Sequence, residues 1–153
     1  MIVTAVSGDT AVVISLRNET MNDFQTKISQ LMPGMVAIVG VPSDENSSFL
    51  RGPAQAPNHI RQVLHNGAAN LCAENGHNLG QEPRLLDVGD MPLGTNCWLA
   101  DGSPMIAQHI ASLLAKEVRV LSLGGDHAIT FPVVQAFAAQ YPNLSRSKFQ
   151  KII

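Results

Sequence analysis

Short apolar runs alternate with helix-length amphipathic segments from residue 35 onward. The runs at 35–41, 85–90 and 118–123 are typical of strands buried in a parallel sheet. Residues 57–67 and 103–114 carry apolar side chains at helical spacing, which predicts helices that each cover the sheet with one face. A further helix is predicted to start at Thr130. Strands joined by helices form βαβ units, so the sequence predicts an α/β fold with helices covering the faces of a parallel sheet.

The apolar helix faces define the side chains expected in the core. They are Ile60, Val63 and Leu64 in the first helix, and Ile106, Ile110, Leu113 and Leu114 in the second.

Residues 1–34 follow a different pattern. The runs 2–6 and 11–16 flank a turn-rich tetrad compatible with a hairpin, and a helix is predicted before Pro33-Gly34. Its apolar positions are Phe24, Ile28 and Leu31. We interpret residues 1–34 as an N-terminal extension, either an appended element or the result of an upstream translation start, and residues 35–153 as the α/β domain.

Composition narrows the classes of function. Ten Lys and Arg against twelve Asp and Glu give a net charge of −2, which argues against a nucleic-acid-binding domain. No apolar run approaches the roughly 18 residues of a membrane helix, and the first residues lack the features of a signal peptide. The two cysteines, Cys72 and Cys97, form no CxxC motif and are interpreted as small buried hydrophobic residues. We therefore predict a cytoplasmic protein without nucleic-acid or membrane partners.

The carboxyl ends of parallel strands are where such folds place their chemistry, so loops 42–56, 89–102 and 124–130 matter most. Gly124-Gly125 follows the third predicted strand and allows a tight turn before Asp126 and His127. The His127 imidazole could bind a metal ion there, with the Asp126 carboxylate orienting it. The alternative is a strand-to-helix turn whose polar residues only cap the helix.

Two carboxylates, Asp87 and Asp90, close the second predicted strand. They could serve acid–base or metal chemistry, but three positions along a strand should place them on opposite faces, so that only one reaches the site. A turn-forming role is the alternative.

The loop after the first strand and the helix that it runs into bring two arginines available for anchoring, Arg51 and Arg61. Arg51 could bind an anionic group or bond to loop carbonyls. The remaining histidines show no mutual ligand spacing and are interpreted as surface or hydrogen-bonded residues, and Trp98 as loop packing. These histidines are His59, His65, His77 and His109. The sequence has no GxSxG, P-loop or GxGxxG motif, which weakens nucleotide-dependent interpretations.

Taken together, these segments resemble the N-terminal part of the arginase/agmatinase (ureohydrolase) family. The resemblance covers about residues 35–144 and leaves the first 34 residues outside it. It rests on the order and spacing of Gly40-Val-Pro42, Arg51-Gly-Pro53, Ala56-Pro57, Ile60-Arg61, Asp87-Val-Gly-Asp90 and Gly124-Gly-Asp-His-Ala-Ile-Thr130.

The resemblance implies a three-layer α/β fold and a pair of manganese ions that activate a hydroxide to hydrolyse a guanidino C–N bond and release urea. It implies that His127 is a metal ligand. Ala128 replaces the serine that is frequent after this histidine. A small guanidino compound is the expected substrate, and a homo-oligomer is possible. Agmatine is weakly favoured by the Arg-Gly-Pro segment, with arginine and formimidoyl compounds left open.

The family's other ligand segments, Asp-Ala-His-x-Asp and Asp-x-Asp, do not occur in the sequence. One imidazole cannot hold a manganese pair, so we expect an incomplete, truncated ureohydrolase domain that is inactive alone. The alternatives are a non-catalytic fragment that at most associates with other chains, or an unrelated binding module.

Overall fold

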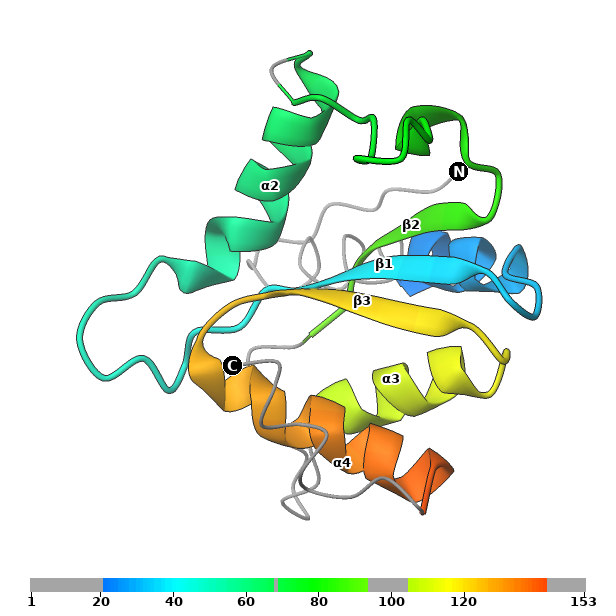
Figure 1. Ribbon diagram of the computed structural model, residues 1–153. Coiled ribbons are helices and arrows are strands. Elements are labelled where there is room, and N and C mark those ends of the chain that lie inside the picture. Colours follow the sequence, from blue (N-terminus) through cyan, green and yellow to red (C-terminus); the bar gives the residue numbers. More distant parts are fainter. Residues whose placement is uncertain (1–20, 68, 94–104, 143–153) are drawn as a thin grey trace, which may run out of the picture.

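A parallel sheet lies at the centre of the computed structural model, which describes residues 21–67, 69–93 and 105–142. Its strands are β1 (Val36–Val41), β2 (Leu85–Asp90) and β3 (Arg119–Gly124), in the order β2-β1-β3 (Figure 1). Val36 of β1 pairs with Leu85 of β2 and with Arg119 of β3. The strands match the predicted runs to within one residue at either end, which confirms the parallel α/β class.

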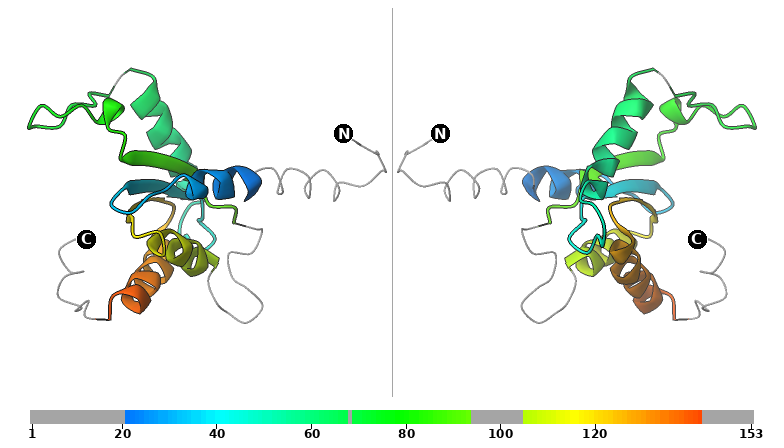
Figure 2. Two further views of the ribbon diagram at one scale, coloured as in Figure 1. Left: turned by 90° about the vertical axis from the view of Figure 1, so that its right-hand side faces the viewer. Right: turned by 90° about the vertical axis from the view of Figure 1, so that its left-hand side faces the viewer.

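Helices lie on both sides of the sheet. The helices α3 (Met105–Leu114) and α4 (Thr130–Gln140) cover one face, while α2 (Ala56–His65) lies on the other (Figures 1 and 2). Three short 3-10 turns lie in the connections: η1 (Pro53–Gln55), η2 (Leu79–Gln81) and η3 (His127–Ile129). The arrangement confirms the three-layer fold. No helix in the described ranges is both long and apolar enough to cross a bilayer.

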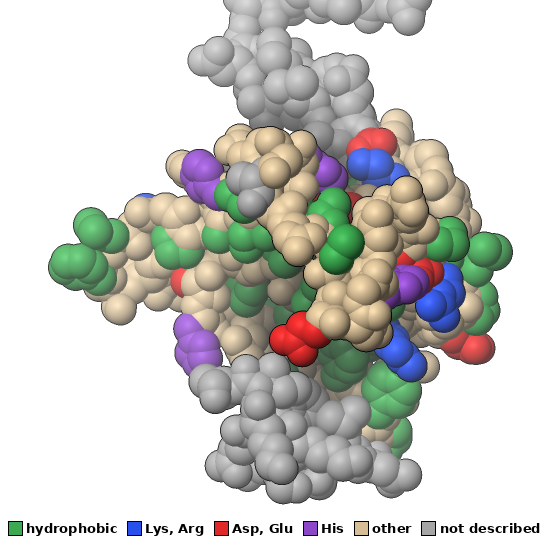
Figure 3. All heavy atoms as spheres, turned by 45° about the horizontal axis from the view of Figure 1, so that its top comes forward, with side chains coloured by type: hydrophobic (Ala, Val, Ile, Leu, Met, Phe, Trp, Pro, Cys, Tyr) green, Lys and Arg blue, Asp and Glu red, His purple; other side chains and the backbone are tan. Residues whose placement is uncertain are grey.

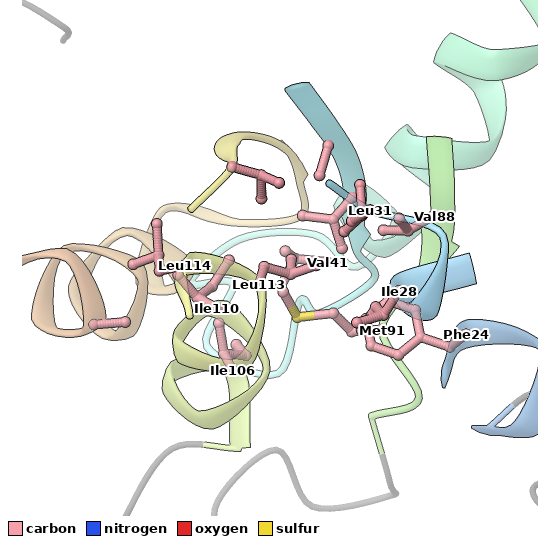
Figure 4. Close-up of a cluster of buried hydrophobic side chains, with 14 of the residues drawn as sticks. Phe24, Ile28, Leu31, Val41, Val88, Met91, Ile106, Ile110, Leu113 and Leu114 are labelled. Atoms are coloured by element: carbon pink, nitrogen blue, oxygen red, sulfur yellow. The ribbon is translucent and has the colours of Figure 1, made fainter. Parts of the chain in front are cut away.

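The core lies between the sheet and α3. Ala37, Val39 and Val41 alternate along β1 and are completely buried on this face, because successive side chains of a strand point to opposite sides. All three belong to the buried cluster that also contains the apolar side chains of α3, and Figure 4 shows Val41 beside Leu113 in this cluster. The four apolar side chains predicted for α3 are all buried, which confirms that face: Ile106, Ile110, Leu113 and Leu114.

The segment before β1 contributes to the same core. Residues 21–29 are helical, as predicted, and Phe24, Ile28 and Leu31 are at most 5% exposed. The Phe24 ring packs edge-on against His109, with centroids 5.5 Å apart, and burial lowers the pKa of His109. From residue 21 onward the predicted extension therefore packs into the α/β domain. The predicted strands at 2–6 and 11–16 lie outside the described residues.

The opposite face of the sheet is less completely covered. Ile60 and Val63 of α2 were expected to be buried, but they are 40% and 52% exposed. Leu121 of β3, on the α2 side of the sheet, is 51% exposed. Within the described residues β3 pairs only with β1, so nothing in that part of the chain extends the sheet beyond Leu121.

The cysteine prediction is also corrected in part. Cys72 is exposed, because it lies in a small antiparallel bridge with Asn78 outside the core. Cys97 and Trp98 lie outside the described residues.

The turn between α3 and β3 contains a strained residue that can be tested. Glu117 has a φ of 57°, the left-handed region that favours glycine, and its carbonyl accepts a 3.0 Å hydrogen bond from Gly34 N. Glu117→Gly should raise the free energy of unfolding by about 1 kcal/mol, because glycine adopts this conformation without a Cβ clash. Urea denaturation measures the change. Lys116→Gly, at the neighbouring position, is the control, and an equal effect of the two variants would contradict the strain.

Candidate functional site

The loop after β1 and the turn after β3 meet closely at the carboxyl edge of the sheet. The backbone N–H of Asp126 donates to the Ser43 carbonyl at 2.9 Å. A Cβ added at Gly125 would lie only 1.8 Å from the same carbonyl oxygen. Gly125 is therefore required for the close approach of two backbones, and a larger residue would separate the two segments.

The Asp126 carboxylate joins these two segments. Its Oδ1 accepts a 3.0 Å bond from Ala128 N and so caps η3, the turn that begins with His127. Its Oδ2 accepts bonds from Asn46 N at 3.1 Å and from Ser47 Oγ at 3.4 Å, across about eighty positions of sequence. In the described residues this carboxylate makes no bond to the His127 ring. The capping alternative thus holds for Asp126, and its carboxylate also links η3 to the loop after β1, which the sequence did not predict.

His127 begins η3 directly beyond the carboxyl end of β3, at the edge that the sequence predicted. Its side chain is exposed, so the imidazole nitrogens are accessible to a metal ion. Among residues 21–67, 69–93 and 105–142, no three His, Cys, Asp or Glu side chains converge as a metal site. The described residues therefore place one candidate ligand, His127, at this edge and do not by themselves fit a manganese pair.

Asp87 and Asp90 bind the same guanidinium. Arg61 of α2 donates from Nε and Nη2 to the two Asp87 oxygens, at 2.7 and 3.0 Å, and from Nη1 to Asp90 Oδ1. The prediction that the two carboxylates lie on opposite faces was wrong, because both lie on the α2 side of the sheet. The sequence indicated Arg61 as a residue available for anchoring but did not indicate that it binds Asp87 and Asp90.

A β-bulge explains the error. Ile38 pairs with Asp87 and Val39 with Gly89, so Val88 is an extra residue in β2. Gly89 has a φ of 86°, which glycine adopts at no steric cost. The extra residue shifts the alternation by one, and the carboxylates three positions apart therefore share a face.

The contact between α2 and the sheet depends on a second glycine. A Cβ at Gly40 would lie 1.9 Å from Asp90 Oδ1 and 2.9 Å from Pro57 Cβ. Arg61 is held in this crowded region: burial would lower its pKa, but the hydrogen bonds it donates to Asp87 and Asp90 outweigh burial and raise the pKa. The guanidinium is thus a permanent positive charge between two carboxylates.

The loop after β1 is closed at its base by Asp44. Its carboxylate accepts bonds from Gly52 N at 2.7 Å and Ala54 N at 3.3 Å, and the Gly52 bond is the main cause of a lowered Asp44 pKa. Arg51 donates to the Asp44 carbonyl and lies 3.6 Å from its carboxylate, so the loop-carbonyl alternative describes Arg51. The tip of this loop carries Phe49, which is 89% exposed.

The other histidines lie apart from His127. His59 and His65 are exposed on α2, and His109 packs on Phe24. The His77 ring lies 2.7 Å from Glu82, near the opposite end of the sheet.

The chain is thus a three-layer α/β protein in which His127 follows the third strand. The turn that carries His127 is capped by Asp126 and requires glycine at position 125. Residues 35–149 match the arginase family, and the chain belongs to that family. The match begins at the residue where the sequence placed the start of the domain.

The relatives of this chain include arginases and agmatinases. The chain is 42% identical over 106 residues to arginase 1, mitochondrial, of Arabidopsis thaliana, covering 65% of this chain and 31% of the relative. It is 29% identical over 115 residues to an agmatinase of Chromobacterium violaceum, covering 69% and 33%. The structure of arginase from Medicago truncatula superposes with a TM-score of 0.62 and 29% identity, covering 86% of this chain and 43% of that one. The chain thus spans about a third of the length of these curated relatives.

Removing the guanidinium tests the Arg61 network. Arg61→Met should lower the free energy of unfolding by about 2 kcal/mol, because it leaves two partly buried carboxylates without their donor. Arg61→Lys should recover only part of the loss, since one ammonium cannot make the same three bonds. Urea denaturation gives both values, and full recovery by lysine would show that charge alone matters.

The backbone approach at Gly125 gives a second test. Gly125→Ala should cost about 3 kcal/mol, because the methyl group overlaps the Ser43 carbonyl. Gly80→Ala is the control: its added Cβ would meet side-chain atoms of Leu71 and Asn78, at 3.1 and 3.2 Å, rather than backbone. Thermal or urea unfolding measures the difference, and equal losses in the two variants would contradict the geometry.

Proposed function

We propose that this chain provides the first metal-ligand segment of a manganese-dependent ureohydrolase domain, with His127 as the ligand. The observation that carries the proposal is the position of His127, exposed on the capped turn at the carboxyl edge of a family-matched sheet. The Asp126 cap and the Gly125 contact with Ser43 would fix the backbone from which the imidazole reaches the metal. Hydrolysis of a guanidino C–N bond is the reaction of such a domain.

Arginine is the substrate we propose to test first. Identity is 42% to the Arabidopsis arginase and 29% to the Chromobacterium agmatinase over segments of similar length. The higher identity to the arginase supports arginine as the substrate, whereas the Arg-Gly-Pro segment had weakly favoured agmatine.

Catalysis would require ligands beyond those of the described residues. A manganese pair takes several carboxylate and imidazole donors, and His127 supplies one. We therefore propose that the 153 residues alone do not release urea. Cytoplasmic location and homo-oligomer formation stay predictions, and the Arabidopsis relative is itself named as mitochondrial.

A chimera separates the scaffold from the missing ligands. Residues 35–142 would replace the matching segment of Arabidopsis arginase 1, and urea release from arginine and agmatine would be measured with manganese. We expect activity in the chimera, preferentially on arginine, and none in the 153-residue chain. His127→Ala in the chimera should lower kcat at least about 100-fold and reduce the manganese bound per chain.

The matched control is His65→Ala, because His65 is an exposed histidine and the last residue of α2. It should retain both metal and activity. Unchanged metal content in His127→Ala would reject the ligand assignment, and urea release by the 153-residue chain would reject the need for further ligands. A folded but inactive chimera would favour the non-catalytic alternative, which the exposed Leu121 and the unpaired edge of β3 in the described residues also support.

A further inference from the structure

A cavity of about 250 Å³ lies at the amino edge of the sheet, at the other end of the strands from His127. The first residue of each strand lines it: Val36 of β1, Leu85 of β2 and Arg119 of β3. These amino ends are at the right in Figure 1, and Figure 3 shows basic, acidic and histidine side chains gathered on that side. The cavity is therefore lined by both apolar and charged residues.

One wall is a guanidinium held in a fixed orientation. Arg84 donates to the Glu82 carboxylate from Nε at 2.8 Å, from Nη2 at 3.1 Å and from its backbone N at 3.0 Å. The bonds to Arg84 and to His77 lower the pKa of Glu82 to about 2, so the carboxylate is ionised at neutral pH. Nη1 of Arg84 makes no bond within the described residues and stays available to a ligand.

The second wall is Arg119, whose side chain is exposed and has no acidic partner among the described residues. Because Val36 pairs with both Leu85 and Arg119, β1 separates the two arginines. Neighbouring strands lie about 4.8 Å apart, so the two arginine backbones are about 10 Å apart, within the combined reach of two guanidinium groups on one small ion.

The charged groups that line the cavity leave one positive charge in excess. They are two guanidinium groups and one ionised carboxylate, Glu82, and the apolar residues Val36 and Leu85 line the cavity with them. Guanidinium groups bind carboxylates through paired N–H bonds, and an apolar lining favours an aliphatic group.

We propose that this cavity binds a small monocarboxylate with a short aliphatic chain, its carboxylate between Arg84 and Arg119 and its chain against Val36 and Leu85. The site is independent of the metal-ligand edge, since the two lie at opposite ends of the strands.

Butyrate is a suitable probe. It would be titrated at constant ionic strength into the ¹⁵N-labelled chain, and binding would be followed by NMR from the amide signals of four lining residues: Gly34, Val36, Leu85 and Arg119. Saturable shifts are expected. Arg119→Gln should weaken binding at least about tenfold and Arg119→Lys less, because lysine keeps the charge without the paired donors. Lys116→Gln removes a nearby charge that does not line the cavity, and it should change the affinity by less than about twofold.

Arg119 is exposed, so its variants should keep the amide spectrum of the core, with Ala136 as an internal check. Absence of saturable shifts in the unaltered chain would overturn the proposal. So would equal weakening by Lys116→Gln, which would indicate a diffuse positive field. Inorganic phosphate is the comparison ligand, and tighter binding of phosphate than of butyrate would overturn the assignment to a carboxylate.

Discussion

The guanidinium of Arg61, held between two carboxylates of β2, determines how the α2 layer lies on the sheet. The apolar side chains of α2 contribute little, since Pro57 is its only buried residue and Ile60 and Val63 remain largely exposed. Three hydrogen bonds to Asp87 and Asp90 provide the directional contact instead, in a partly buried setting where charges interact more strongly than in water. The position of α2, and of the loop leading into it, follows from this ionic contact more than from hydrophobic packing.

The strands and α3 could be predicted because their signals are periodic and local. The run before Val41 and the four apolar positions of α3 correspond to structure almost residue for residue. The burial of Ile60 and Val63 could not be predicted in the same way, because a helix pattern shows which face is apolar and not whether the described chain covers it. Phe24 shows the reverse case, in which a segment interpreted as an extension packs into the core.

The position of the candidate site could be predicted from the sequence, but the hydrogen-bond partners of its residues could not. Gly125 and His127 could be located because glycines after a buried strand mark the functional edge of a parallel sheet. The bonds from Asn46 and Ser47 to Asp126 join positions about eighty residues apart, and no local pattern reports such a contact. The Asp126 carboxylate is thus a structural link between two loops, and the motif combines one exposed imidazole with residues that hold its backbone.

The bulge in β2 couples the ionic contact to the core. Beyond Gly89, Asp90 faces α2 while Met91 lies in the core, 2% exposed. If Val88 instead paired with Val39 in a regular ladder, both would be inverted: the Asp90 carboxylate would point into the apolar interior and Met91 would point out of it. The bulge therefore sets both the face on which Asp90 lies and the burial of Met91. A β2 whose register slips by one residue at this point loses the bond from Arg61 to Asp90 and the burial of Met91 together.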